Sequence, residues 1–316
     1  MTGNEALRRK LGELVRSRRG TEARADASAR AQAGNRAIRQ PLALMSMSAP
    51  FEEVPGGPGD PAAPSVRATG VEAFLPGGEW RDEHGAVYVH ERLRSEAEPR
   101  RSHWGRIGAV PEHEPELVAL AATGLERALF LDLETGGLSS SPVFLAGTMQ
   151  WNGEDFVLRQ YFARHYGEEA ALLSALHQAA RGFEYLVTFN GKSYDAPFLQ
   201  NRAFIHGVRL ELPPRHLDLL HIARRRWKGE LRDCKLQTLE YHVCGRRRVG
   251  DVAGEEVPGL YHDFVRNGDP YPLIPVFHHN LLDVITMGEI LHALCGSRKP
   301  KGRTPAVGAE GREAMD

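Results

Sequence analysis

The stretch Ala128-Leu-Phe-Leu-Asp-Leu-Glu-Thr135 is an apolar run that carries two acids at alternate positions. Successive side chains of a β-strand point to opposite faces, so Asp132 and Glu134 would share one face while Leu131 and Leu133 pack on the other. Two carboxylates so close together repel each other unless a cation lies between them. The stretch therefore predicts a strand that ends in a metal site. The alternative is an edge strand with one solvated face.

Two further acids lie on elements that would bring them to the same place. Residues 185–199 are typical of a strand, an Asn-Gly turn and a helix that begins at Asp195. Asp283 lies within a long helical stretch, shortly after two adjacent histidines. Each motif alone is a weak signal. Together, in this order and on these element types, they indicate one site built from four carboxylates.

These motifs resemble the DEDD exonucleases of the ribonuclease H-like superfamily. That family's pattern is D-x-E, then N-G-x-x-x-D-x-P, then a final acid preceded by Tyr or His. The matching acids here are Asp132, Glu134, Asp195 and Asp283. Residues 235–283 are more similar still to the bacterial YprB-type branch. The resemblance covers roughly residues 125–295, a length that fits one domain.

The order of the expected elements agrees with this resemblance. We expect strands at 128–134, 143–151, 156–163 and 185–189, and helices at 167–181, 195–206 and 275–295. Three strands joined by short turns, followed by alternating helices and strands, predict an α/β fold: a ribonuclease H-like mixed β-sheet flanked by α-helices. The first strand and the last helix would meet at the crevice where the site lies.

Four carboxylates suit phosphodiester hydrolysis by two divalent ions about 3.5 to 4 Å apart, in which one ion activates water and both neutralise charge on the departing oxygen. Oxygen ligands favour Mg²⁺ or Mn²⁺, and the sequence has no Cys/His cluster that would favour zinc. The resemblance implies that Asp132 bridges both ions. It further implies that Glu134 and Asp283 complete one metal site and that Asp195 serves the other, partly through water.

His279 and His278 are the candidates for the general base. On a regular helix His279 is about 40° around the axis from Asp283, so both would point into the site, whereas His278 would point about 140° away. In the histidine-type DEDD enzymes the catalytic histidine stands five residues before the final acid, the position of His278. The YprB-type H-N-x-x-D pattern and the helical geometry both favour His279. We therefore expect His279 to be catalytic and keep His278 as the alternative.

Four residues are candidates for substrate contacts. Thr135 and Gly136 follow the first acids and would offer backbone N–H groups to the 3′ end of a strand. Asn190 and Gly191 would turn the backbone toward the terminal nucleotide. An ordinary turn is the alternative explanation at both places.

Three other features have two explanations each. Asp218 would lie near the site, or it would cap the N-terminus of a helix. The arginine runs at 224–226 and 246–248 would contact phosphates, or they would form a solvated face.

Composition sets the outer limits. The chain has 316 residues, of which 41% are hydrophobic and 26% charged, as in ordinary soluble globular proteins. Its net charge of −1 gives no overall polyanion-binding signature, yet bound metal ions and local basic patches would still allow nucleic acid to bind. Three cysteines without zinc or redox spacing indicate a reducing cytoplasm. The sequence has no run of about 18 apolar residues, so it predicts no membrane span.

The two ends of the chain differ from its middle. Residues 1–40 carry ten Lys/Arg and four Asp/Glu, and Pro and Gly are frequent from about 49 to 69. We expect residues 1–69 to be a largely disordered basic tail and linker, although a short basic amphipathic helix is an alternative for its first part. We expect a strand-rich extension at 70–125, the nuclease domain at 126–297 and a disordered tail at 298–316.

The sequence thus predicts a metal-dependent 3′–5′ exonuclease that acts on single-stranded DNA or RNA ends in the cytoplasm. Direction and exonuclease mode come from the resemblance. DNA and RNA both stay open, because contacts to a 2′-hydroxyl leave no local motif. The competing hypotheses are a ribonuclease H-like module that binds nucleic acid without cutting it, and a scaffold whose basic N-terminus recruits a partner.

Overall fold

A seven-stranded mixed sheet lies at the centre of the structure, a computed structural model that describes residues 70–101, 104–138 and 141–296. The strand order is β1-β2-β5-β4-β3-β6-β7. The strands are β1 (Gly78–Asp82), β2 (Gly85–Leu93), β3 (Ala128–Thr135), β4 (Val143–Trp151), β5 (Phe156–Phe162), β6 (Tyr185–Thr188) and β7 (Arg215–Asp218). Each neighbouring pair in the series β1-β2-β5-β4-β3 is antiparallel. Strand β6 is parallel to β3, and β7 is parallel to β6. The predicted α/β mixed sheet is confirmed.

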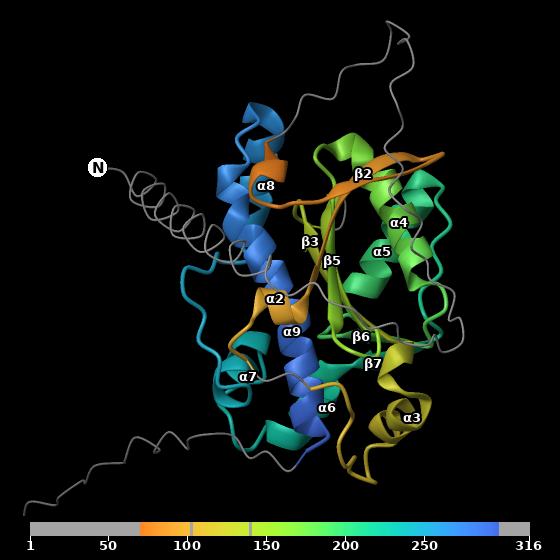
Figure 1. The fold of residues 1–316 in the computed structure, drawn as a ribbon, viewed down its shortest axis with the longest axis vertical. Helices are drawn as coiled ribbons and strands as arrows, with labels where there is room; N and C mark the ends of the chain where they lie inside the picture. Colours follow the sequence, from red (N-terminus) through yellow and green to blue (C-terminus); the bar gives the residue numbers. More distant parts are fainter. Residues whose placement is uncertain (1–69, 102–103, 139–140, 297–316) are drawn as a thin grey trace, which may run out of the picture. The chain divides into compact units, whose positions relative to one another are not determined.

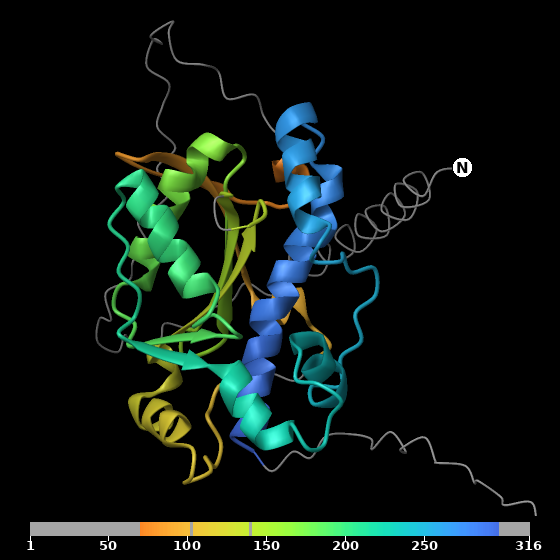
Figure 2. The same ribbon diagram turned by 180° about the vertical axis from the view of Figure 1, so that it is seen from behind.

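Helices cover both faces of this sheet. They are α2 (Arg94–Ala97), α3 (Pro115–Thr123), α4 (Glu169–Ala180), α5 (Asp195–His206), α6 (Leu219–Trp227), α7 (Leu236–His242), α8 (Val257–Asn267) and α9 (Ile274–Leu294). Short 3-10 helices occur at η1 (Val71–Ala73), η2 (Leu125–Arg127), η3 (Tyr166–Glu168) and η4 (Tyr271–Leu273). Figures 1 and 2 show α4 and α5 on one side of the sheet and the long helix α9 on the other.

The alternation of side chains along β3 follows from these two layers. Leu131 and Leu133 pack in the apolar cluster that contains α4 and α5, whereas Phe130 belongs to the cluster that contains α6 and most of α9. Asp132 and Glu134 share the face of Phe130 and therefore point toward α9. The acids thus lie on the face opposite the leucines, as the sequence predicts.

The predicted elements of the core agree closely with the observed ones. The expected strands at 143–151 and 156–163 correspond to β4 and β5, and the expected helix at 275–295 corresponds to α9. β2 pairs with β5, so the strands of the 70–125 extension belong to the same sheet. The domain boundaries stay predictions, and residues 1–69 and 298–316 lie outside the described residues. Among the described helices, none combines the length and the apolar character needed to cross a bilayer.

Candidate metal centre

The carboxyl end of β3 extends past its parallel neighbour. β6 pairs with β3 only from Ala128 to Phe130, while the half of β3 that carries Asp132 and Glu134 changes from buried to half-buried. The register with β4 shifts between Glu134 and Thr135, where the strand ends. Both acids therefore lie at an open corner of the sheet rather than in its centre.

Asp195 and Asp283 reach this corner from two helices. Asp195 is the first residue of α5, and its carboxylate accepts a hydrogen bond from the backbone of Leu133 in β3. Asp283 lies in the middle of α9, which packs on β3 and β4. The structure therefore brings together the four acids that the sequence predicts, from β3, α5 and α9.

The electrostatics of the site show that the four acids interact. Burial, followed by the charges of Asp283, Glu134 and Asp195, raises the pKa of Asp132 well above its ordinary value. Burial also raises the pKa of Glu134 to about 8 and that of Asp195 to about 7, and neighbouring acids add to both shifts. Burial raises the pKa of Asp283 despite the nearby Arg248 and His279. Such a group of acids becomes fully ionised only with added positive charge.

His279 lies between two acids. Its Nδ1 is 2.8 Å from Oδ1 of Asp251, and its Nε2 is 3.5 Å from Oδ2 of Asp283. Burial lowers the pKa of His279, but the hydrogen bond to Asp251 and the charges of Asp283 and Glu134 outweigh this effect and raise the pKa to about 9. His279 is buried, whereas His278 is exposed to solvent. Of the two candidate bases, only His279 contacts the acids.

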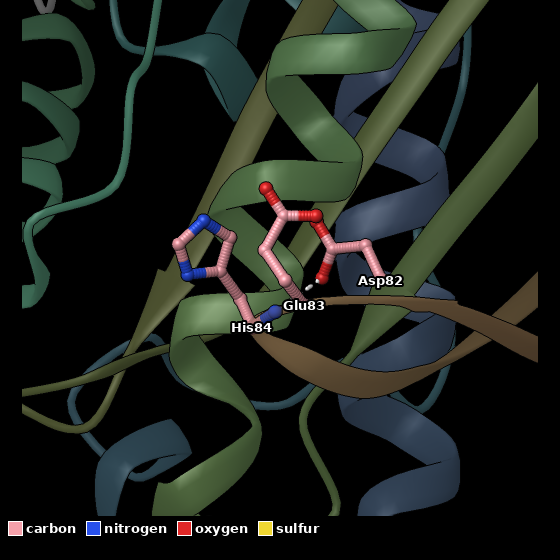
Figure 3. A group of neighbouring side chains, drawn as sticks. All are labelled: Asp82, Glu83 and His84. Carbon is pink, nitrogen blue, oxygen red and sulfur yellow. Dashed lines mark hydrogen bonds between the residues drawn. The ribbon is translucent and has the colours of Figure 1, made fainter.

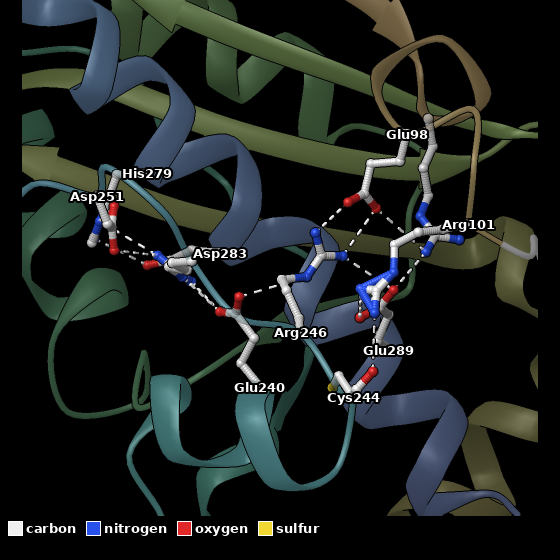
Figure 4. A network of polar contacts seen from close by, with 11 residues as sticks. Glu98, Arg101, Glu240, Cys244, Arg246, Asp251, His279, Asp283 and Glu289 are labelled. Atoms are coloured by element: carbon white, nitrogen blue, oxygen red, sulfur yellow. Dashed lines mark hydrogen bonds and ion pairs between the residues drawn. The ribbon is translucent and has the colours of Figure 1, made fainter. Parts of the chain in front are cut away.

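An ion-pair network continues from this site into the protein (Figure 4). Arg248 donates to Asp283, to Asp251 at 3.2 Å and to the buried Glu240 at 2.7 Å. Glu240 in turn lies 3.6 Å from Arg246. Arg246 binds Glu98 and Glu289, which also hold Arg94 and Arg101. The arginine run at 246–248 is therefore largely an internal network and not a solvated face.

Residues 129–295 match the family model of the RNase H superfamily. The chain belongs to this superfamily. It is 34% identical over 175 residues to the uncharacterized protein YprB of Bacillus subtilis (strain 168), a match that covers 53% of this chain and 42% of that protein. The chain thus spans less than half the length of this relative. A solved family B DNA polymerase from the hyperthermophilic archaeon Pyrobaculum calidifontis matches with a TM-score of 0.44 and 17% identity, over 53% of this chain and 24% of the polymerase.

A cavity of about 320 Å³ in this RNase H superfamily domain lies beside the acids. Its lining includes Glu134, Thr135, Leu138, Tyr194, Asp195 and Phe198. Leu138 and Tyr194 are 80% and 53% exposed, and the rings of Tyr194 and Phe198 are stacked with their centroids 6.5 Å apart. The cavity therefore combines two of the predicted metal ligands with an apolar, partly aromatic wall.

The predicted substrate-contact residues divide into two groups. Thr135 lines the cavity, and its hydroxyl donates to the carbonyl of Gly137 at 2.9 Å. The N–H of Gly136 donates to the carbonyl of Pro142 at 2.8 Å, as in an ordinary turn. It follows that Thr135 is better placed than Gly136 to meet a ligand.

Asn190 and Gly191 form a turn that Asp218 holds in place. The backbone N–H groups of Asn190 and Lys192 donate to Asp218 at 2.8 and 3.0 Å, and Asp218 also caps α6 through the N–H of Leu220. Asn190 has φ 68°, and a Cβ on Gly191 would come within 2.4 Å of the Thr188 hydroxyl. The helix-cap explanation of Asp218 is thus confirmed, and Asp218 also shapes this turn. Asp218 lies near the site as well, because its charge contributes to the raised pKa of Asp195.

Three residues near the acids make contacts that the sequence did not predict, although one of them, Arg248, belongs to the arginine run that the sequence offered as a phosphate contact. They are Arg248, Asp251 and Asn280, whose side chains contact Asp283, His279 and Asp132 respectively. All three lie within the segments that carry the YprB-type resemblance, which was the available signal.

A separate group of possible ligand atoms occurs at the β1–β2 turn (Figure 3). Asp82, Glu83 and His84 each offer one such atom, all within 4.8 Å of one another. The turn itself explains much of this arrangement, because Asp82 accepts from the backbone of His84 at 2.8 Å and from the Ser174 hydroxyl at 2.6 Å. We therefore do not include this group in the candidate site.

Proposed function

We propose that this chain is a metal-dependent nuclease that hydrolyses phosphodiester bonds by a two-metal-ion mechanism, acting as a 3′–5′ exonuclease of DEDD type on single-stranded DNA or RNA ends. The observation that carries the proposal is the convergence of Asp132, Glu134, Asp195 and Asp283 beside one cavity. Membership of the RNase H superfamily, a nuclease-type fold, supports it. We assign this activity to residues 126–297.

The donor set fits hard divalent cations. It consists of carboxylate oxygens, which Mg²⁺ and Mn²⁺ prefer, and the raised pKa values of the acids indicate a deficit of positive charge. When bound, two such ions would supply an activated water and neutralise the charge that develops on the leaving oxygen. Asp132 would bridge the ions, Glu134 and Asp283 would complete one site, and Asp195 would serve the other.

His279 is the general base in this proposal. Its Nε2 faces Asp283, and its Nδ1 is held by Asp251, so the imidazole has one nitrogen directed toward the site. Burial lowers the pKa of His279, while the hydrogen bond to Asp251 and the charges of Asp283 and Glu134 raise it. When these carboxylates hold cations, their contribution to the raised pKa of His279 would weaken, which favours the neutral imidazole whose Nε2 can accept a proton from water.

The cavity supports a single-stranded substrate. Its volume of about 320 Å³ is near the lower end of small-molecule sites, which suits a terminal nucleotide and not a duplex. Leu138, Tyr194 and Phe198 offer an apolar and aromatic surface on which an unpaired base can stack.

All three cysteines are buried free thiols, which supports the predicted cytoplasmic location.

The test is degradation of single-stranded DNA and RNA, labelled at the 3′ or the 5′ end, with Mn²⁺, Mg²⁺ or EDTA. We expect the wild-type protein to release mononucleotides from the 3′ end only when metal is present. Asp132→Asn and Asp283→Asn should abolish the release, while the control Asp82→Asn at the separate acidic turn should keep it.

Two results would contradict the proposal. Binding of the strands without any cleavage would favour the non-catalytic nucleic-acid-binding module. Neither binding nor cleavage would favour the scaffold hypothesis, whose basic N-terminal region lies outside the described residues.

A further inference from the structure

A polar row crosses the apolar sheet beneath α9. Asp132 on β3 pairs directly with Gly147 on β4, and Gly147 pairs directly with Gln160 on β5. Residues that pair directly across neighbouring strands project from the same face, so Asp132 and Gln160 point to the same side, separated by a residue that has no side chain. The row therefore leaves a gap over Gly147 in the layer between the sheet and α9.

The amide of Asn280 fills this gap. Its Nδ2 donates to Oδ2 of Asp132 at 3.0 Å and to the Asp132 carbonyl at 3.3 Å, and its Oδ1 accepts from Nε2 of Gln160 at 3.0 Å. Gln160 also donates to the carbonyl of Phe277 at 2.8 Å, which fixes its own amide. Asn280 is fully buried. The hydrogen bond from Gln160 fixes the orientation of the Asn280 amide. If the amide were rotated by 180°, its NH₂ group would face the NH₂ group of Gln160, and its oxygen would face the carboxylate of Asp132.

The contact requires glycine at position 147 because there is no room for a side chain there, and not because of the backbone angles of Gly147. A Cβ at position 147 would lie 2.2 Å from Oδ1 and 2.8 Å from Nδ2 of Asn280, closer than any real contact. Its φ is outside the left-handed region. A glycine inside a central strand weakens the sheet, which makes the close approach of Asn280 the physical reason for its presence.

We propose that Asn280 is a positioning residue which, held by Gln160 over Gly147, fixes the carboxylate of Asp132 for cation binding. One oxygen of Asp132 is engaged by the amide, so the carboxylate cannot rotate freely and its other oxygen is left for the metal. Removal of such outer partners typically costs 10- to 100-fold in metal affinity or activity. The inference rests on the proposed metal-dependent function and goes beyond it by assigning how the bridging ligand is oriented.

The test compares Asn280→Ala, Gly147→Ala and the double variant with wild type, and uses the exposed Asn201→Ala as a matched control. Mn²⁺ affinity is measured by calorimetry, kcat and KM on single strands, and folding by thermal melting. We expect Asn280→Ala to weaken Mn²⁺ binding and lower kcat, each by roughly 10- to 100-fold. KM for the strand should change little, because Asn280 does not line the cavity.

The double variant separates positioning from general loss of structure. Gly147→Ala alone should resemble Asn280→Ala, because its Cβ displaces the amide, and in the Asn280→Ala background it should add no further loss of Mn²⁺ affinity. If either alanine variant does not fold, Gln160→Met decides the question. It keeps the side-chain length, removes the donor to Asn280 and should weaken Mn²⁺ binding on its own.

The outcomes of this experiment are distinguishable. A folded Asn280→Ala or Gln160→Met protein that binds Mn²⁺ as wild type does, with lowered melting temperature alone, would overturn the positioning role and leave the proposed nuclease intact. A wild-type protein that neither binds Mn²⁺ nor cuts would overturn the proposed function, and the positioning role with it.

Discussion

Nδ1 of His279 lies 2.8 Å from Oδ1 of Asp251, a residue 28 positions earlier in the chain. A carboxylate can only accept in this contact, so Nδ1 carries the hydrogen and Nε2 is the nitrogen that faces Asp283. Asp251 itself has its pKa lowered, because its hydrogen bond and ion pair with His279 and Arg248 outweigh the effect of burial. Asp251 is therefore an anion that selects the tautomer of His279.

Asp251→Asn should lower kcat by about 10- to 100-fold, less than the 10² to 10⁴ that general acid–base catalysis supplies in full, because His279 itself is still present. The amide keeps the size of the side chain but loses the charge that holds Nδ1–H. In a His279→Ala background the same substitution should have no further effect on kcat. Equal losses in both backgrounds would contradict the role, and Asp263→Asn on the exposed face of α8 is the matched control.

Metal-free wild type should lose stability as pH rises from about 5 to 8. In the unfolded chain Glu134 loses its proton near its ordinary pKa of 4.5, whereas in the folded chain its pKa is about 8. Between these values the folded state holds more protons, so raising the pH favours unfolding. Glu134→Gln should weaken this dependence of stability on pH. At pH 8 in EDTA the variant should have a higher melting temperature than wild type. A variant that melts below wild type under those conditions would contradict the burial of an uncompensated acid at this position.

Leu138→Ala and Tyr194→Ala should each raise KM for single strands and leave kcat nearly unchanged. Loss of an aromatic side chain that stacks on a base, as in Tyr194→Ala, costs about 1 to 3 kcal/mol per base, roughly a 5- to 150-fold change in affinity, and loss of the apolar Leu138 contact should cost less. Phe204→Ala is the control, because Phe204 is 85% exposed on α5 but does not line the cavity. If all three substitutions raised KM equally, the loss of exposed apolar surface in general, and not of contacts in the cavity, would explain the change in KM.

Arg248→Met should destabilise the fold by up to about 3 to 5 kcal/mol, the cost of leaving a buried ion without its partner. The buried Glu240 accepts from Arg248 at 2.7 Å, and when Arg248 is removed, the ion-pair partner that remains for Glu240 among the described residues is Arg246 at 3.6 Å. Adding Glu240→Gln should restore part of the stability, as measured by urea unfolding. No restoration in the double variant would show that Glu240 is not the residue left unpaired.

Local patterns in the sequence were enough to predict much of the fold and the four acids. The acids of β3 follow a period of two, and the distance from His279 to Asp283 is one helical turn, so both relationships are set by the geometry of a single element. The boundaries of β4 were predicted to the residue. These are the relationships that local pattern determines.

Contacts between distant segments could not be predicted in this way. Gln160 and Asn280 are 120 positions apart, and their contact depends on how closely α9 approaches the sheet. Asp251 reaches His279 only through the path of the loop after α7, which has no periodicity. In the sequence, Gly147 is a glycine within a predicted strand, and nothing near it indicates that Asn280 packs against it. Only the structure shows that a Cβ at this position would clash with the Asn280 amide.

The most direct test of the account is a crystal structure of the protein with Mn²⁺, analysed by anomalous scattering. We predict two peaks about 3.5 to 4 Å apart, both in contact with the carboxylate of Asp132, with Glu134 and Asp283 at one ion and Asp195 near the other. Absence of any peak at Asp132, or a peak only at Asp82, Glu83 and His84, would contradict the two-metal site.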